Sequence, residues 1–497
     1  MASNTINQAT AEKQRPSPVD TDGMPPGIPF IIGNEAAERF CFYGMRTILV
    51  VFMTKYLVDR TGALAVMKPE EAKGWFHLFV SAVYFLPFFG AILADAFWGK
   101  YRTILILSVV YCIGCLALSL DNTRTGLLIG LGLIAIGSGG IKPCVSANVG
   151  DQFGPRNQHL LTKAFAWFYF SINFGSFFST MLTPFLLEPH SEAARNFLAT
   201  SPGWVAALKT LDPNTILAFL ETKLCPGIIQ YHGPRLAFGV PGVFMLLATM
   251  VFWAGRNRFI RMPPAGKEFV KEMFRRDNLL IIARLVPIFL AEAIFWSLWD
   301  QSGSAWVLQA EKMDLNFLFE WRSSQVQAVN PLLILVLIPF CTYALYPMIN
   351  RFFKLTPLRR IGIGLFITVP SFLLSAWIES KIGLGLKPNI GWQFLGFVIL
   401  SLAEIMVSIT CLEFAYTQAP AKLKSLIMSL NLLSISLGNA ITSGINFFIS
   451  NPDGTSKLPG ASYFLFFATM MAVTAVAFIF IARAYKEQTS GQGRATA

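Results

Sequence analysis

Long apolar segments recur along the whole sequence and limit the folds that the chain can adopt. Each is roughly 20 residues long, which in a helix is enough to cross about 30 Å of hydrocarbon. We expect twelve such spans, at residues 28–58, 73–97, 101–120, 125–149, 160–187, 234–255, 281–306, 328–349, 361–379, 392–417, 425–449 and 460–483. The sequence therefore predicts an all-α membrane protein with twelve transmembrane helices.

The composition and the distribution of charge agree with a membrane protein. Of the 497 residues, 54% are hydrophobic and only 14% are charged, too few to cover the surface of a soluble chain of this length. The net charge of +12 could suggest nucleic acid, but the basic residues gather in the loops after even-numbered spans. By the positive-inside rule these loops are cytoplasmic. We therefore expect a multi-pass protein of the cell membrane with both termini cytoplasmic and no nucleic-acid partner.

The longest basic loop divides the spans into two groups of six. The expected organisation is a cytoplasmic tail at 1–27, an N-terminal six-helix bundle at 28–255, a cytoplasmic linker at 256–280, a C-terminal six-helix bundle at 281–485 and a second tail at 486–497. In the linker, the segment PAGKEFVKEMFRR has apolar and basic sides, which predicts a helix lying on anionic headgroups. Each half also has a basic turn after its second span. This weak symmetry favours the major facilitator fold, whose site lies between the halves near the midplane.

Ionisable side chains occur inside the apolar spans, where an isolated charge costs several kcal/mol. They are Glu35, Glu38, Arg39 and Arg46 in the first span, Lys142 in the fourth, Asp300 in the seventh and Glu404 in the tenth. The four in the first span fall on one helical stripe, which must face the interior of a bundle or water. One interpretation is a neutralised cluster that only locks this helix. Because such charges recur in other spans, we favour a functional role.

Several motifs resemble those of the proton-dependent oligopeptide transporters. The segment EAAERFCFYG resembles the family motif ExxERFxYYG, and GAILADAFWGKYRTI resembles the family's turn between spans 2 and 3. Similar signatures follow in spans 4, 5, 7, 8 and 10: IKPCVSANVGDQF, FYFSINFGS, FWSLWDQSGS, AVNPLLILVLIPF and LEFAYTQAP. Some of these motifs are closer to the animal di-/tripeptide transporters. The resemblance implies a major facilitator fold and proton-coupled symport of di- and tripeptides into the cell.

The charge set suits such a substrate on chemical grounds. A di- or tripeptide presents a carboxylate and an ammonium at a nearly fixed spacing, so a site for many peptides needs cations at one end and an acid at the other. The N-terminal half supplies the cations Arg39, Arg46 and Lys142, and the C-terminal half supplies the acid Glu404. The resemblance implies that Lys142 and Arg46 meet the peptide carboxylate.

The same resemblance assigns the rest of the binding site. It implies that Glu404, with Asn173 and Asn330, holds the ammonium and the peptide groups. The side chains expected to line the pocket are Tyr43, Tyr84, Phe295 and Trp296. We expect the partners to be peptides, protons and the lipid bilayer, and the active form to be a monomer.

Proton coupling needs groups whose protonation changes which conformation is stable. Burial favours the neutral form of a carboxyl, and a nearby cation favours the ionised form. Both effects act on Glu35 and Glu38, which lie beside Arg39, so we expect the protonation state of these two carboxyls to be sensitive to their surroundings. The resemblance implies that Asp300 pairs with Arg46 to close the external side. Protonation of Asp300 would then release Arg46 for the substrate.

Two further features concern gating. Histidine side chains ordinarily titrate near neutral pH, and the resemblance to the animal members implies that His77 in the second span accepts a proton. The alternative is a hydrogen-bonded core histidine. Asp95 and Lys100, in the turn after span 2, are expected to pair as a latch between conformations.

Departures from the family pattern leave the preferred peptide open. Phe42 stands where the family motif has its first Tyr, and Asn431 stands where many members have a pocket Trp. Glu292 has no family counterpart that we can assign. A transporter of nitrate or another anion, and a drug exporter, are the alternatives on the same fold. An enzyme would need a clustered nucleophile, metal or phosphate motif, and we find none in the sequence, so no cofactor or metal is expected.

Overall fold

The computed structural model describes residues 21–188, 215, 233–264, 266, 275–418 and 424–485. Most of the two tails, of the loop at 188–233 and of the expected linker helix lies outside these residues. The described chain is almost entirely helical. Apart from the connecting loops, it contains a short hairpin, β1 (Asn316–Phe317) and β2 (Phe319–Glu320), in which Phe317 pairs with Phe319.

Helices of the first half follow the expected spans closely. They are α2 (Ile28–Lys55), α3 (Pro69–Leu93) continued by η1 (Ala94–Trp98), α4 (Lys100–Leu120), α5 (Arg124–Asp151), η2 (Gln158–Leu160), α6 (Leu161–Leu187), α10 (Pro234–Ala254) and η3 (Gly255–Asn257). The boundaries differ from the expected ones by only a few residues.

The second half has more interruptions within its spans. Its elements are α12 (Arg276–Trp299), η4 (Asp300–Gly303), α13 (Ala305–Ala310), η5 (Ser323–Ala328), α14 (Val329–Phe340), η6 (Cys341–Leu345), α15 (Tyr346–Asn350), α16 (Pro357–Gly383), α17 (Gly391–Glu404), η7 (Ile405–Ile409), α18 (Thr410–Gln418), α19 (Lys424–Ile449) and α20 (Ala461–Ala484). The segments η6 and η7 are π-helical turns, which occur often at functional sites. One of them directly follows Glu404.

Eleven helical segments of the described chain are long and apolar enough to cross a membrane. Helix α2 is also long, at 28 residues, but it carries the ionisable stripe. We count it as the twelfth span because these groups face the protein. Glu35 and Glu38 are fully buried, and Arg46 is 5% exposed. The expected twelve-helix architecture is confirmed.

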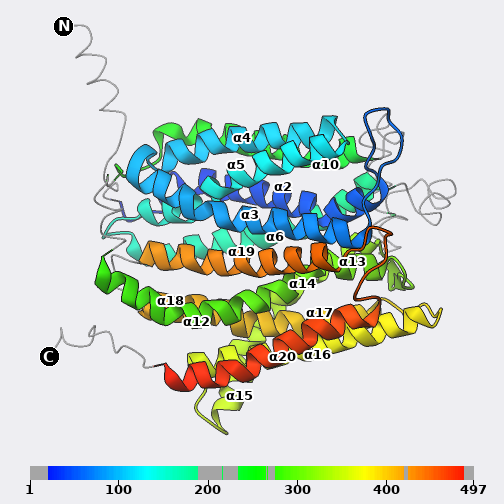
Figure 1. The fold of residues 1–497 in the computed structure, drawn as a ribbon. Helices are drawn as coiled ribbons and strands as arrows, with labels where there is room; N and C mark the ends of the chain where they lie inside the picture. Colours follow the sequence, from blue (N-terminus) through cyan, green and yellow to red (C-terminus); the bar gives the residue numbers. More distant parts are fainter. Residues whose placement is uncertain are drawn as a thin grey trace.

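The helices divide into two halves with separate hydrophobic cores (Figure 1). One core contains Phe52 and Phe238, and the other contains Trp306 and Phe397. At the boundary, α3 packs against α19, and α6 packs against α14. Helix α2 reaches η4 and η5 of the second half. The charged stripe of the first span therefore lies beside the interface between the halves.

A close helix contact fixes two elements of the site. Helix α3 packs so tightly on α5 that a Cβ on Gly90 would lie 2.3 Å from the carbonyl oxygen of Gly139. Only glycine fits there without moving the backbone. Helices α3 and α5 carry Tyr84 and Lys142, so this contact holds the two side chains in one region.

Ion pairs join the two halves at the end that carries the loop at 56–68. The ammonium of Lys55 lies 2.7 Å from a carboxylate oxygen of Glu311, and Arg322 lies 3.2 Å from Glu188. Each pair has one partner in each half. The structure is therefore closed at this end.

The expected latch is wrong in its partner. Lys100 forms an ion pair with Asp151 at 2.7 Å, and no pair between Lys100 and Asp95 is present in the described chain. The backbone reverses at Gly99, whose φ is +77°, so Lys100 begins α4 and its side chain reaches the end of the adjacent α5. The sequence spacing alone did not indicate this reversal.

Candidate functional site

The acidic groups of α2 neutralise a basic group on the same helix. The Nε of Arg39 lies 2.6 Å from Glu35 and 3.2 Å from Glu38. The first of these pairs has the i,i+4 spacing that brings side chains together on a helix. Arg39 is therefore held by two carboxylates of its own helix rather than left free for a substrate carboxylate.

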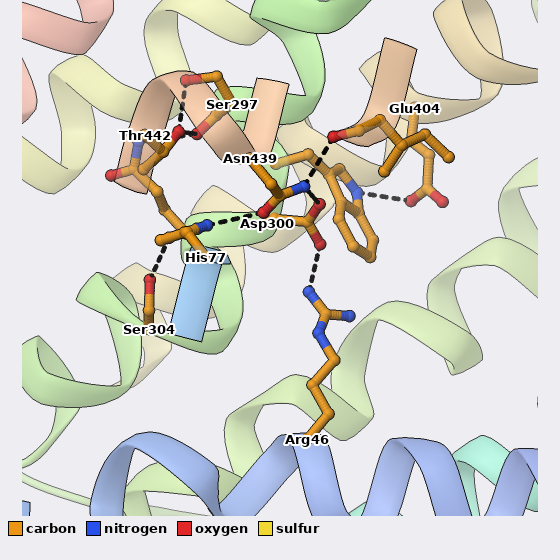
Figure 2. Close-up of polar contacts among 11 residues, drawn as sticks. Arg46, His77, Ser297, Asp300, Ser304, Glu404, Asn439 and Thr442 are labelled. Atoms are coloured by element: carbon orange, nitrogen blue, oxygen red, sulfur yellow. Dashed lines mark hydrogen bonds and ion pairs between the residues drawn. The ribbon is translucent and has the colours of Figure 1, made fainter. Parts of the chain in front are cut away.

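Arg46 points away from this cluster and crosses to the second half. Its guanidinium forms an ion pair with Asp300, the first residue of η4 (Figure 2). It also lies over the rings of Phe76 and Trp299, 5.6 and 5.5 Å from their centroids. Such cation–π contacts add to the attraction that holds the guanidinium in place. This ion pair was expected, and the structure contains it.

Asp300 is also the start of a chain of hydrogen bonds that leads to His77 (Figure 2). The side-chain amide of Asn439 donates to Asp300 at 2.5 Å. Its carbonyl oxygen accepts from Nδ1 of His77 at 2.7 Å, and the Ser304 hydroxyl lies 2.8 Å from Nε2. Because His77 belongs to α3 while Asn439 and Ser304 belong to the second half, the chain links the two halves.

Glu404 lies at the end of α17 and is held only by neutral donors. Its Oε2 accepts from the amide of Asn330 at 2.8 Å and from the indole of Trp299 at 2.9 Å. Asn330 also donates to the Ser401 hydroxyl at 2.9 Å. No ion pair to Glu404 occurs within the part of the chain that the structure describes. The carboxyl is therefore oriented but not neutralised.

Lys142 is the corresponding cation in the first half. Its ammonium lies over the rings of Phe42 and Tyr84, 3.9 and 4.2 Å from their centroids. The residue is only 9% exposed, and its Nζ has no hydrogen-bond partner among the described residues. Of the three expected cations, Arg39 and Arg46 are paired with acids and Lys142 is not.

Tyr43 and Asn173 were also expected in the site, and their contacts are with neighbours on their own helices. Tyr43 is partly exposed beside Phe42, with ring centroids 5.4 Å apart. The amide of Asn173 donates to the backbone carbonyl of Tyr169 on its own helix at 3.0 Å, and it has no hydrogen bond to Glu404 in the described chain. The structure therefore groups Glu404 with Asn330 but not with Asn173.

The two expected wall residues of α12 differ in position. Phe295 is fully buried in the core of the second half, so it is not available to a ligand in this conformation. Trp296 is 8% exposed and donates its indole N–H to Glu292 at 3.2 Å. Both side chains therefore belong to the packed core of the second half, and Trp296 keeps a small exposed surface.

Sequence reasoning missed Asn439, Ser304 and the indole of Trp299. Helix α19 did contain a signal for the first, since its buried polar residues are spaced by three or four. Those with this spacing are Ser436, Asn439, Thr442, Ser443 and Asn446. A polar stripe inside an apolar span indicates a surface that faces other protein groups. No comparable pattern marked Ser304.

Comparison with known proteins places the chain in a family. A model of the POT family matches residues 101–282 and 275–466. Peptide transporter family 1 of Drosophila melanogaster is 35% identical over 399 residues, which cover 72% of this chain and 48% of that protein. Solute carrier family 15 member 2 of Homo sapiens is 30% identical over 446 residues, 80% of this chain and 55% of that protein. The chain thus spans about half the length of these curated relatives.

Solved structures agree with the family match. The crystal structure of the POT family transporter PepTSo is 33% identical, with a TM-score of 0.77, and the alignment covers 94% of this chain and 99% of that chain. A second structure, of a proton dependent oligopeptide (POT) family transporter, is 34% identical, with a TM-score of 0.69 and coverage of 91% and 100%. The expected major facilitator fold and the resemblance drawn from the motifs are both confirmed. The chain belongs to the POT family.

Proposed function

We propose that this protein is a proton-coupled symporter that moves di- and tripeptides into the cell by alternating access. One observation carries the proposal: the two halves present opposite charges that lack an ionic partner in the described chain. Lys142 on α5 is a cation without an anion, and Glu404 on α17 is an acid held by neutral donors. A peptide supplies the missing carboxylate and ammonium at its two ends.

The substrate contacts follow from this arrangement. Lys142 binds the peptide carboxylate, joined by Arg46 when Arg46 leaves Asp300. Glu404 and Asn330 bind the ammonium. Asn173 contacts the peptide groups, and the lining residues are Tyr43, Tyr84, Phe295 and Trp296. Phe295 reaches the substrate only in a conformation that uncovers it, whereas the partly exposed Tyr43 is available in the present one.

Protons act on the ion pair that joins the halves. A proton on the Asp300 carboxyl removes its charge, so the attraction to Arg46 is lost and Arg46 is free to meet a peptide. His77 shares this site through Asn439, so a proton on its imidazole changes the same hydrogen-bond chain. Glu35 and Glu38 exchange a proton against their pairs with Arg39. Each inward proton is also driven by about 2.3 kcal/mol per 100 mV of membrane potential.

The bundles at 28–255 and 281–485 move against each other, with the linker at 256–280 between them. The positive-inside rule places the basic loops and both termini in the cytoplasm, so the end closed by Lys55 and Glu311 faces outside. The structure is then the outward-closed state of a monomer in the cell membrane. Anion transport and drug export are not favoured, because neither requires a cation such as Lys142 and an acid such as Glu404 that lie in opposite halves without ionic partners in the described chain.

Uptake of labelled dialanine into proteoliposomes tests the proposal. With acid outside, the peptide should accumulate above its external concentration while the vesicle interior acidifies. Lys142→Gln should abolish this uptake, whereas Lys163→Gln, a substitution of an exposed lysine on α6, should leave it unchanged. Uptake that stops at equal concentrations, or that is indifferent to the pH gradient, would refute symport.

A further inference from the structure

Glu292 is a buried acid that the mechanism above does not use. It lies on α12 and is 1% exposed. Both of its carboxyl oxygens accept from the amide of Asn431 on α19, at 2.8 and 2.7 Å. The indole of Trp296 donates at 3.2 Å, and the thiol of Cys411 on α18 donates at 3.1 Å. Three elements of the second half therefore hold one carboxyl.

None of these neighbours carries a charge. The groups around the carboxyl are an indole from α12, a thiol from α18, and an amide and the Ser434 hydroxyl from α19. Cys411 is the titratable group among them, and no ion pair to Glu292 exists in the described part of the chain. A buried carboxylate without a counter-charge costs several kcal/mol, so the site favours uptake of a proton.

Asn431 suits a carboxyl that changes its protonation state. An amide offers two N–H donors and one carbonyl acceptor. Its N–H groups serve the ionised carboxylate, as in the structure. After protonation, a rotation of the amide lets its carbonyl accept the new carboxyl O–H. Glu292 therefore keeps a hydrogen-bond partner in both states.

The pair repeats the arrangement at the external gate. Asp300 and Asn439 each lie eight residues after Glu292 and Asn431, and each carboxyl accepts from the amide on the facing helix (Figure 2 shows the Asp300 pair). Helices α12 and α19 pack against each other along this line. At 1.5 Å per residue, the two pairs are about 12 Å apart along the helix. The same helix interface thus holds two carboxyl–amide pairs, of which one has a cationic partner.

Two indoles connect Glu292 to the acid assigned to the peptide ammonium. Trp296 donates to Glu292, and its ring lies edge-on to Trp299 with centroids 5.3 Å apart. Trp299 in turn donates to Glu404. A peptide that draws Glu404 toward its ammonium shifts Trp299, and with it the donor that Trp296 offers to Glu292. These contacts form a route by which substrate binding can change the hydrogen bonds of Glu292.

We propose that Glu292 carries a second proton through the transport cycle, in addition to the proton that acts on Asp300. The proposal rests on the proposed function as a peptide symporter. The external proton forms an O–H bond on the Glu292 carboxylate while the protein is open to the outside. It leaves to cytoplasmic water after the conformational change, and no other bond forms or breaks.

Counting charges per peptide tests the proposal. Dialanine is a zwitterion without net charge, so each charge that moves with it is a proton. With equal pH on both sides and a fixed dialanine gradient, the membrane potential at which net uptake stops is inversely proportional to the protons per peptide. For a wild type that moves two protons, Glu292→Gln should double that potential. Glu413→Gln, at an exposed position on α18, should leave it unchanged.

A second variant tests the same role if Glu292→Gln fails to fold. Replacing both Glu292 and Asn431 with Leu removes the buried polar pair together, which is tolerated better than removing one partner. It should give the same doubled potential. If the potential is unchanged in either folded variant, or if the wild type moves a single proton, the proposed role of Glu292 is wrong. Proton-coupled symport would not be contradicted by either result. A wild type whose uptake does not respond to potential would refute proton-coupled symport itself.

Discussion

Replacing Asp300 with Asn should open the end of the protein that we propose to face outside. Arg46 is 5% exposed, and its pair with Asp300 crosses from α2 to η4. Removing one partner of a buried ion pair costs about 3–5 kcal/mol. The rings of Phe76 and Trp299 remain over the guanidinium and offset part of this loss. We therefore expect the closed state to lose about 3 kcal/mol, roughly a hundredfold change in the equilibrium between closed and open forms.

A single added thiol measures this change. Ser443 on α19 is 3% exposed and donates to the carbonyl of Gly74 on α3 at 2.8 Å, so it lies between the halves near the closed end. In a Ser443→Cys background, a membrane-impermeant thiol reagent added outside should react about a hundredfold faster when Asp300 is Asn. The protein without Ser443→Cys gives the background, and Asp59→Asn, in the exposed loop, is the matched control.

An equal rate of modification with Asp300 and with Asn at this position would show that the ion pair does not hold this end closed. The same variant separates coupling from binding. It should lose proton-driven accumulation of dialanine but keep exchange of peptide for peptide, since the binding charges are intact. Equal loss of both activities would show that Asp300 serves binding or folding instead.

Four other substitutions test separate parts of the site. Glu404→Gln should abolish uptake of free dialanine but affect peptides with a blocked amino terminus much less, because only the ammonium loses its counter-charge. Normal uptake of dialanine by this variant would contradict the assignment of Glu404 to the peptide ammonium. Glu35→Gln and Glu38→Gln should each fold and exchange peptide, yet lose the stimulation of uptake by external acid. The measurement is peptide uptake against external pH, normalised to the amount of folded protein. A wild-type pH profile in both variants would show that these acids have only a structural role. Asn439→Ala should lower the free energy of unfolding by about 1–3 kcal/mol in detergent melts, because it leaves buried partners without hydrogen bonds; an unchanged melting temperature would contradict the bridging role.

Local patterns were sufficient for the transmembrane architecture. The length of an apolar run and the spacing of charges on a helix depend on neighbouring residues, so the twelve spans and the burial of Glu35 and Glu38 followed from the sequence. The failed latch shows the limit. Lys100 and Asp95 are close in sequence, but the turn at Gly99 directs Lys100 to Asp151.

The sequence by itself determined that the chain crosses the membrane twelve times and that several of its spans carry ionisable groups. Only the tertiary structure decided which charges are satisfied. Arg46 and Asp300 are 254 residues apart and His77 and Asn439 are 362 apart, yet both pairs are in contact. The packing of one half on the other neutralises Arg46 and leaves Lys142 unpaired among the described residues. The energy of a buried charge depends on its neighbours in space, and sequence separation carries no information about them.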